Sequence, residues 1–324
     1  AGVESEVRMW VHEEALPSGE KLTEYINRTG RNDKYLEGVQ LGANVRAVPD
    51  VREAVRGATH VVFVAPHQFL GGICDTLVGD GSDALLAPGA KAVSLIKGMD
   101  VAPSAPRLLS TLIEDALSVE CGVLMGANIA SEVAAERFSE ATLGVAGGAG
   151  SKAAGEWIAL FERPYFSVRA TGDVSTVEMC GTLKNVVAIA AGLVDGLGYG
   201  SNSKSAIMRL GLLEMYRFAQ LVSPETADKG TMFESCGVAD LIASCLGGRN
   251  RKVADAFARA GGKRSFEELE AELLSGQKLQ GVLTAHEVAE ALNAQGRRSE
   301  FPLFSMVDRI AKGEEPPESI VSLS

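Results

Sequence analysis

Lys184 and Asn185 are the residues most able to do chemistry, because the stretch around them has few other polar side chains. From Met179 to Val194 the other residues are apolar, small or glycine, Thr182 apart. Burial disfavours the ammonium form of a lysine and lowers its pKa, which suits a general acid or base near neutral pH. The competing interpretation is a helix whose lysine extends to solvent. Lys184 is therefore the first candidate for proton transfer.

A second candidate group lies in the segment CGVADLIASCLGGRNRK. Asp240 and Ser244 are four residues apart, which places them on one face if the segment is helical. The Gly-Gly pair then breaks the helix before Arg249 and Asn250. Free backbone N–H groups at a helix start, next to a guanidinium, form a good phosphate site. The alternative is a glycine helix end followed by a solvated basic helix.

Further polar residues follow predicted strands or lie in a turn. Lys97 follows AVSLI and could bind an anion or a reacting oxygen, and Asn128 follows VLMGA. Taken alone, Asn128 is expected to cap the next helix rather than to bind a ligand. His67 is expected to be an ordinary loop histidine without a role in proton transfer. Lys278 and Gln280, in QKLQG, read by themselves as a polar turn.

The first half of the chain alternates short β-rich runs with helix-like stretches, which predicts βαβ units and a parallel, doubly wound sheet. Ligands bind such sheets at the carboxyl ends of the strands. THVVFVAP is nearly continuous in apolar residues, so it is expected to be a central strand covered on both faces. The predicted strands are RMWVHE, ANVRAV, THVVFVAP, KAVSLIKG and CGVLMGAN.

Long helical stretches dominate after Thr171, so the second half is predicted to be an all-helical domain. Glycine and proline punctuation near Pro164 and Gly172 indicates the boundary. We expect a dinucleotide-binding domain over residues 1–170 and a helical substrate and catalytic domain over 171–324. The predicted helices are VSTVEMCGTLKNVVAIAAGLVDGL, SAIMRLGLLEMYRFAQLV, FEELEAELL and TAHEVAEALNA.

Composition limits the partners of the chain. Its formal net charge of -11 disfavours nucleic acid and anionic membrane, which are bound through clustered lysine and arginine. An anionic substrate must therefore meet locally placed positive charge. The five cysteines are scattered, with no CxxC pair and no histidine at zinc spacing, so they are expected to be reduced thiols without a metal. No apolar run is long enough to predict a membrane span.

A glycine-rich phosphate loop is missing from the position where a dinucleotide fold needs it. No GxGxxG precedes Val7, and RMWVHEE resembles the second strand of such a fold. Glu13 and Glu14 would then lie near the ribose hydroxyls. The first strand and its fingerprint are expected upstream of this sequence. GVAGGAG, at 144–150, has the wrong spacing and is expected to be a plain surface connection.

A series of short sequence segments, spread over residues 7 to 312, resembles a known protein family. They are WVHEE, PHQF, SLIKG, LMGANIASEV, CGTLKNVVAIAAG, RLGLLEM, ESCGVADLI, GGRNRKVADAF and GQKLQG. In this order and spacing they resemble the NAD-dependent glycerol-3-phosphate dehydrogenases of the eukaryotic type. The combination of KNVVA with GGRN is much more specific than a lone glycine motif. Two departures are Ser244, where the family more often has threonine, and His12, where it often has an aromatic residue.

The resemblance implies an oxidoreductase that interconverts dihydroxyacetone phosphate and sn-glycerol 3-phosphate with NAD as cofactor. It makes Lys184 the general acid and base, with Lys97 and Asp240 as its catalytic neighbours. The implied substrate-binding residues are Asn185, Ser244, Arg249, Asn250 and Lys97, and the implied cofactor contacts are Phe69, Asn128, Arg249, Lys278 and Gln280. A cytoplasmic homodimer is expected by analogy, although organelle targeting stays open.

Two alternatives remain at this point. The missing glycine loop would fit a non-catalytic homologue that has lost its cofactor. The two-domain plan is also found in 3-hydroxyacid and 6-phosphogluconate dehydrogenases, which use a lysine and an asparagine on the long helix. The GGRN segment favours glycerol phosphate over these substrates, and the retained charged residues favour an enzyme, because buried charge is costly to keep without use.

Overall fold

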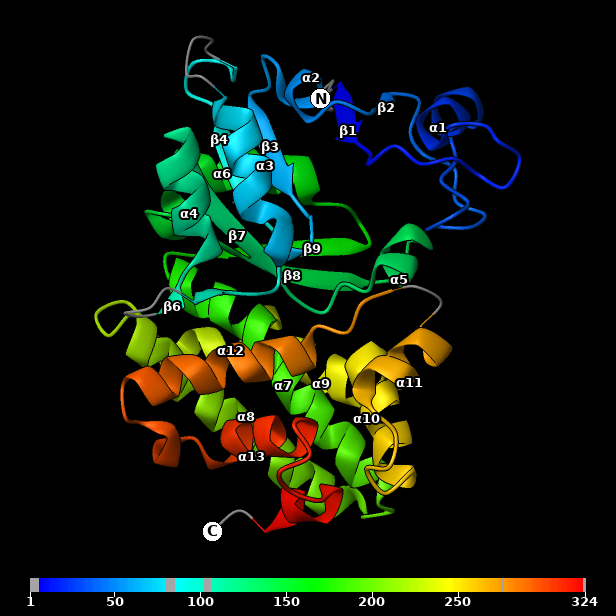
Figure 1. The fold of residues 1–324 in the computed structure, drawn as a ribbon. Coiled ribbons are helices and arrows are strands. Elements are labelled where there is room, and N and C mark those ends of the chain that lie inside the picture. Colours follow the sequence, from blue (N-terminus) through cyan, green and yellow to red (C-terminus); the bar gives the residue numbers. More distant parts are fainter. Residues whose placement is uncertain (1–5, 80–84, 102–105, 275–276, 323–324) are drawn as a thin grey trace.

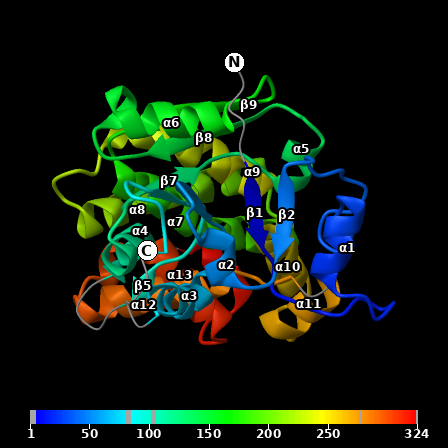
Figure 2. The same ribbon diagram turned by 90° about the horizontal axis from the view of Figure 1, so that it is seen from above.

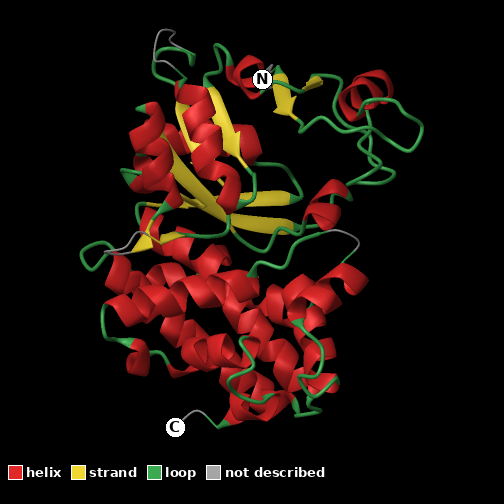
Figure 3. Cartoon of the chain, in the orientation of Figure 1, coloured by secondary structure: helices red, strands yellow, loops and turns green. Residues whose placement is uncertain are grey.

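A computed structural model describes residues 6–322 except 80–84, 102–105 and 275–276. All its strands lie in an α/β part formed by the first half of the chain, and the second half is helical (Figures 1 and 3). The last strand, β9 (Phe166–Thr171), is followed at once by the long helix α7 (Val174–Gly196). The predicted class, a Rossmann-like α/β domain followed by a helical domain, is confirmed.

The main sheet has five strands in the order β3-β4-β7-β8-β9. The strands β3, β4 and β7 are parallel, whereas β8 runs antiparallel to β7 and pairs in parallel with β9. The sheet is therefore mixed rather than wholly parallel. Its first four strands are β3 (His60–Phe63), β4 (Lys91–Ser94), β7 (Glu120–Met125) and β8 (Ser139–Gly144).

The prediction that THVVFVAP forms a central strand was wrong. Among the described residues β3 is the edge of the five-stranded sheet, and it pairs only with β4. Val62 and Val64 are 43% and 65% exposed, while Val61 and Phe63 are buried. An apolar run does not reveal which of its faces a neighbouring element covers, since that depends on the order of strands in the sheet.

The strands β1 (Val7–Trp10) and β2 (Val45–Val48) form a separate parallel pair beside the main sheet (Figures 1 and 2). Helix α1 (Leu22–Thr29) covers this pair through Leu22 and Ile26, and α2 (Val51–Val55) follows β2. A short antiparallel pair, β5 (Asp100–Val101) and β6 (Pro106–Arg107), follows β4.

Helices cover both faces of the main sheet at β4, because alternate residues of this strand are buried in different clusters. On β4, Ala92 packs with α3 (Leu70–Val78) and α4 (Leu109–Leu117), whereas Val93 packs with Trp157 of α6 (Lys152–Phe161). Figure 2 shows α6 on one side of the strands and α4 on the other. The faces of the sheet are therefore covered at β4, whereas the edge strand β3 leaves Val62 exposed.

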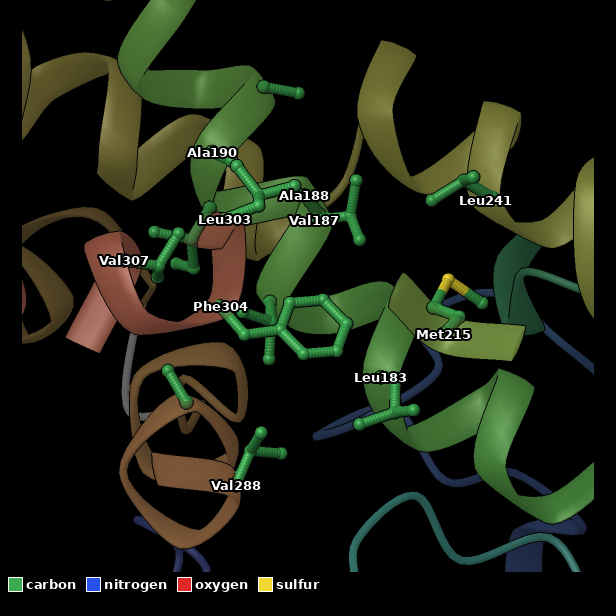
Figure 4. Packing of buried hydrophobic residues seen from close by; sticks show 14 of the residues in the cluster. Leu183, Val187, Ala188, Ala190, Met215, Leu241, Val288, Leu303, Phe304 and Val307 are labelled. Carbon is green, nitrogen blue, oxygen red and sulfur yellow. The ribbon is translucent and has the colours of Figure 1, made fainter. Parts of the chain in front are cut away.

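Helix α7 is the axis of the helical part, and every residue from Ser175 to Val194 is buried. By length and composition it could cross a membrane, yet its apolar window is wholly enclosed by protein, as in a core helix. Figure 4 shows Leu183 and Val187 of α7 packed among Val288, Phe304 and other apolar side chains. The remaining helices are α5 (Ala130–Ala134), α8 (Ser201–Val222), α9 (Asp240–Leu246), α10 (Arg249–Arg259), α11 (Phe266–Leu273), α12 (Gly281–Ala294) and α13 (Pro302–Ala311).

All five cysteines are free thiols in the interior, as predicted. Burial raises the pKa of the Cys245 thiol to about 12, so this side chain is neutral at physiological pH. The described residues contain no group of three histidine, cysteine or acidic side chains that could hold a metal ion.

Two glycines let α7 and α10 approach closely. A Cβ on Gly192 would lie 2.3 Å from the carbonyl oxygen of Arg251, and one on Gly196 would lie 2.3 Å from that of Asp255. Since these neighbours are backbone atoms, they cannot rotate away as a side chain could. The spacing between α7 and α10 therefore depends on the absence of a side chain at both positions.

Replacing Gly192 by alanine should push α10 away from α7 and lower the free energy of unfolding by about 1–3 kcal/mol, the usual range for an overpacked core. Chemical denaturation measures this difference. Gly155→Ala, in α6, is the matched control because its Cβ would meet nothing within 4 Å; it should leave stability unchanged or raise it slightly. Equal stability of the two variants would contradict the packing argument.

Candidate functional site

Lys184, Asp240 and Lys97 meet at the junction of the sheet and the helical part. The Lys184 Nζ atom donates a hydrogen bond to Oδ1 of Asp240, the first residue of α9. Lys97 comes from the segment after β4, and its Nζ lies 3.8 Å from Oδ2 of the same carboxylate. The exposed fractions are only 5% for Lys184 and 3% for Asp240. The interpretation of Lys184 as a solvent-reaching lysine was therefore wrong.

Burial lowers the pKa of the Lys184 ammonium to about 7. This value is a net result, because the positive charge of Lys97 acts in the same direction as burial and the carboxylate of Asp240 opposes both. A group with a pKa near 7 holds its proton about half the time at neutral pH. Lys184 can therefore both donate and accept a proton under physiological conditions.

The position of Asp240 is fixed by a π-helical turn, Ser235–Ala239, that contacts the end of the sheet. The Ser235 hydroxyl donates to the carbonyl oxygen of Glu140 (2.9 Å), and the Cys236 N–H donates to the Thr142 hydroxyl (3.1 Å). Ser244 follows Asp240 by one turn of α9 and is half-buried, so the predicted helical face is confirmed.

A chain of amide hydrogen bonds links three helices beside Lys184. The Asn250 Nδ2 atom donates to Oδ1 of Asn185 (2.9 Å), and the Gly281 N–H donates to Oδ1 of Asn250 (2.9 Å). These residues belong to α10, α7 and the start of α12. Asn185 is next to Lys184 in sequence, so the predicted pair of Asn185 and Asn250 is brought together.

Arg249 is the first residue of α10, as predicted, and the preceding Gly248 has a φ of 85° that favours glycine. The Arg249 side chain is exposed, and its Nη1 atom donates a hydrogen bond to Oε1 of Gln277 (3.1 Å). Lys278 is also exposed and forms an ion pair with Glu270 (2.8 Å). A guanidinium beside free helical N–H groups is a suitable anion site.

The predicted cofactor contacts differ in their surroundings. Phe69, in the turn His67–Phe69, is 58% exposed. The Oε1 atom of Gln280 is buried and has no hydrogen-bond partner among the described residues. Asn128 does not cap the following helix as its sequence position predicted, because the N-cap of α5 is Ile129 and no side chain caps it. The amide of Asn128 is thus not used by the helix start.

Sequence reasoning did not indicate that Thr182, His67 and Glu287 come together beside Gly98, the residue that follows Lys97. The Thr182 hydroxyl binds the backbone of Gly98, and His67 forms a hydrogen bond with Glu287 of α12 (2.8 Å). The signal for Thr182 was present, since it is one of the few polar residues in an otherwise apolar stretch. Glu287 gives no comparable signal, because glutamates are common on amphipathic helices.

The acidic residues after β1 have partners within the chain. The Glu13 carboxylate accepts a hydrogen bond from the Thr23 hydroxyl (2.6 Å), and Glu14 binds the Tyr35 hydroxyl (2.9 Å) and the ammonium of Lys34. The glycine-rich segment 144–150 joins β8 to α6 through a short 3-10 turn, Gly148–Gly150, and its second half lies at the surface. It is a connection, as expected.

The chain matches both models of one protein family. The model described as the N-terminus of NAD-dependent glycerol-3-phosphate dehydrogenase matches residues 1–149, and that of the C-terminus matches residues 173–322. Glycerol-3-phosphate dehydrogenase [NAD(+)] of Cuphea lanceolata is 58% identical over 319 residues, which are 98% of this chain and 84% of that protein. The cytoplasmic human enzyme of the same name is 50% identical, covering 96% and 86% of the two chains.

Solved structures agree with the sequence matches. The structure of DsGPDH from Dunaliella salina has a TM-score of 0.92 and 50% identity; the match covers 99% of this chain and 54% of that one. Glycerol-3-phosphate dehydrogenase from Saccharomyces cerevisiae has a TM-score of 0.83 and 42% identity, with coverage of 98% and 89%. On these matches and on the geometry around Lys184, the chain belongs to the NAD-dependent glycerol-3-phosphate dehydrogenase family.

Proposed function

We propose that this protein interconverts dihydroxyacetone phosphate and sn-glycerol 3-phosphate, with NADH and NAD as the redox partners. The observation that carries the proposal is the buried Lys184, held between Asp240 and Lys97 at the carboxyl end of β4. A lysine with a pKa of about 7 suits a reaction in which an oxygen gains a proton in one direction and loses it in the other.

Lys184 is the proton donor and acceptor in this proposal. In reduction, its Nζ gives a proton to the oxygen of the central carbonyl, and in oxidation the neutral amine takes that proton back. Asp240 holds the ammonium in place and keeps it charged, while Lys97 favours the neutral amine. Burial is the main cause of the lowered pKa of Lys184, and the opposite effects of the two charged neighbours act on top of it.

The residues present fit a nicotinamide cofactor at the reacting end. NAD supplies the acceptor or donor of the hydride when it is bound. Gln280 offers a buried amide oxygen that has no partner among the described residues, and Phe69 offers an exposed aromatic ring. Asn128, Lys278 and Arg249 complete the proposed cofactor contacts.

The phosphate of the substrate is assigned to Arg249 and Asn250 at the start of α10. Arg249 supplies a fork of donors in front of the free N–H groups of the helix. The Asn250 side chain is fixed by Asn185 and Gly281, so it is preorganised for a ligand. Ser244 and Asn185 are placed beside the three-carbon body, which the bound phosphate holds in position.

The assembly and location of the protein are part of the same proposal. We infer a homodimer in the cytoplasm, by analogy with the family. Curated relatives include both cytoplasmic and chloroplastic enzymes.

Lys184→Ala should lower kcat for reduction of dihydroxyacetone phosphate by about 10²- to 10⁴-fold, the usual contribution of a general acid. The loss of NADH absorbance measures the rate. Lys152→Ala is the control, because the Lys152 side chain is 87% exposed and, within the part of the chain that the structure describes, makes only a surface ion pair with Glu156. A Lys184 variant as active as the control would remove this residue from the mechanism.

The pH dependence should be opposite in the two directions. Oxidation needs neutral Lys184, so its kcat should rise with pH through about 7 and then level off, while kcat for reduction should fall over the same range. In Lys97→Met the loss of a neighbouring positive charge should raise the pKa of Lys184. The pH at which kcat changes should then be higher for both oxidation and reduction. An unchanged dependence of kcat on pH in this variant would show that Lys97 does not act on Lys184.

Arg249→Leu should raise KM for dihydroxyacetone phosphate by more than about tenfold, because a charge-assisted bond to phosphate is lost, and kcat should change less. Steady-state kinetics at several substrate concentrations separates the two constants. Arg259→Leu, at the other end of α10, is the control, since this side chain is exposed and pairs with Asp255 alone among the described residues. An unchanged KM in Arg249→Leu would exclude the phosphate role.

A further inference from the structure

We propose that Thr182, His67 and Glu287 are positioning residues that clamp the backbone at Gly98 and so hold Lys97 beside Asp240. The inference rests on the proposed function, because it explains how Lys97 reaches the site of proton transfer. None of the three side chains has to touch the substrate or the cofactor in this role.

The first side of the clamp is the Thr182 hydroxyl on α7. Its Oγ1 accepts a hydrogen bond from the Gly98 N–H (3.1 Å) and donates one to the Gly98 carbonyl oxygen (2.9 Å). Thr182 is fully buried, and Gly98 is buried as well. One hydroxyl therefore satisfies both backbone groups of the residue next to Lys97. Without it, both groups would be buried and unpaired, which is costly.

The second side of the clamp is the imidazole ring of His67. A Cβ added to Gly98 would lie 2.4 Å from Cγ and 2.6 Å from Nδ1 of His67, so the ring rests directly on the Gly98 backbone. The ring is anchored in turn by Glu287, whose Oε1 lies 2.8 Å from Nε2. Glu287 belongs to α12, which packs against α7 (Figure 1). Two helices of the helical part therefore hold Gly98 in place: α7 binds it directly through Thr182, and α12 acts through Glu287 and the His67 ring.

The clamp matters because Lys97 lies in a segment without regular structure between β4 and β5. Its Nζ is 3.8 Å from Oδ2 of Asp240, and its charge lowers the pKa of Lys184. Burial is the largest cause of the lowered pKa, and Lys97 and Asp240 are the charged neighbours that shift it from there. Loosening Gly98 would let Lys97 move away, so the pKa of Lys184 would rise and the reacting groups would lose their alignment.

The test compares Thr182→Val, which removes the hydroxyl but keeps the shape, with Thr182→Ser, which keeps the hydroxyl. Thr182→Val should lower kcat by about 10- to 100-fold, the cost of a misplaced reacting group. It should also raise the pH at which kcat changes, as is expected for Lys97→Met. Peptide-level hydrogen exchange over residues 95–99 should become faster, and this measurement needs neither cofactor nor turnover. Glu287→Ala should speed the same exchange, and Thr182→Ser should behave like the unaltered protein.

The matched control is Thr284→Val on α12. Thr284 is also fully buried, but its hydroxyl has no hydrogen-bond partner among the described residues, so its removal should change neither exchange nor the dependence of kcat on pH. Unchanged exchange in Thr182→Val would overturn the clamp. Faster exchange with an unchanged dependence of kcat on pH would overturn its role in placing Lys97. If the unaltered protein turns over no dihydroxyacetone phosphate, the proposed function fails, while hydrogen exchange still decides whether the clamp exists.

Discussion

A lysine buried in the middle of α7 is the feature to which the rest of the helical part is adapted. Removing an ammonium group from water costs several kcal/mol, and the cost is recovered only with a close partner. Asp240 is that partner, so α9 has to begin at the point where its carboxylate reaches Lys184. The π-helical turn before Asp240 and its bonds to β8 satisfy this requirement. The same burial that makes the charged form of Lys184 energetically costly also lowers the pKa of its ammonium group to about 7.

Buried carboxylates fix the frame around this lysine by binding the starts of helices. Glu178 on α7 accepts hydrogen bonds from the backbone of Leu109 and Ser110, so it joins the helical part to α4 beside the sheet. Glu214 on α8 binds the backbone N–H groups of Leu303 and Phe304 at the start of α13. Burial raises the pKa of both carboxyls to about 7, and the donors oppose that rise. These contacts fix helices from distant parts of the sequence to one another.

The candidate site is composite, because neither part of the chain contains it alone. Lys97 comes from the α/β part, whereas Lys184, Asp240 and Asn250 come from three helices of the other part. Lys97, Lys184 and Arg249 bring positive charge to this site in a protein whose formal net charge is -11. A small phosphorylated substrate would therefore meet a local attraction within a surface that otherwise repels anions.

The sequence by itself determined the class of the fold and which of its elements carry chemistry, although it did not indicate β8 and β9 of the main sheet. Apolar stretches predicted α7 and most strands, and the unusual polar residue in such a stretch singled out Lys184, because a charge is conspicuous where burial is expected. Glycine punctuation likewise placed Arg249 at a helix start. The edge position of β3, the start of α5 after Ile129 rather than at Asn128, and the contact of Thr182 with Gly98 were decided only by the tertiary structure. Each depends on which distant segment lies alongside, and local propensity carries no information about that neighbour.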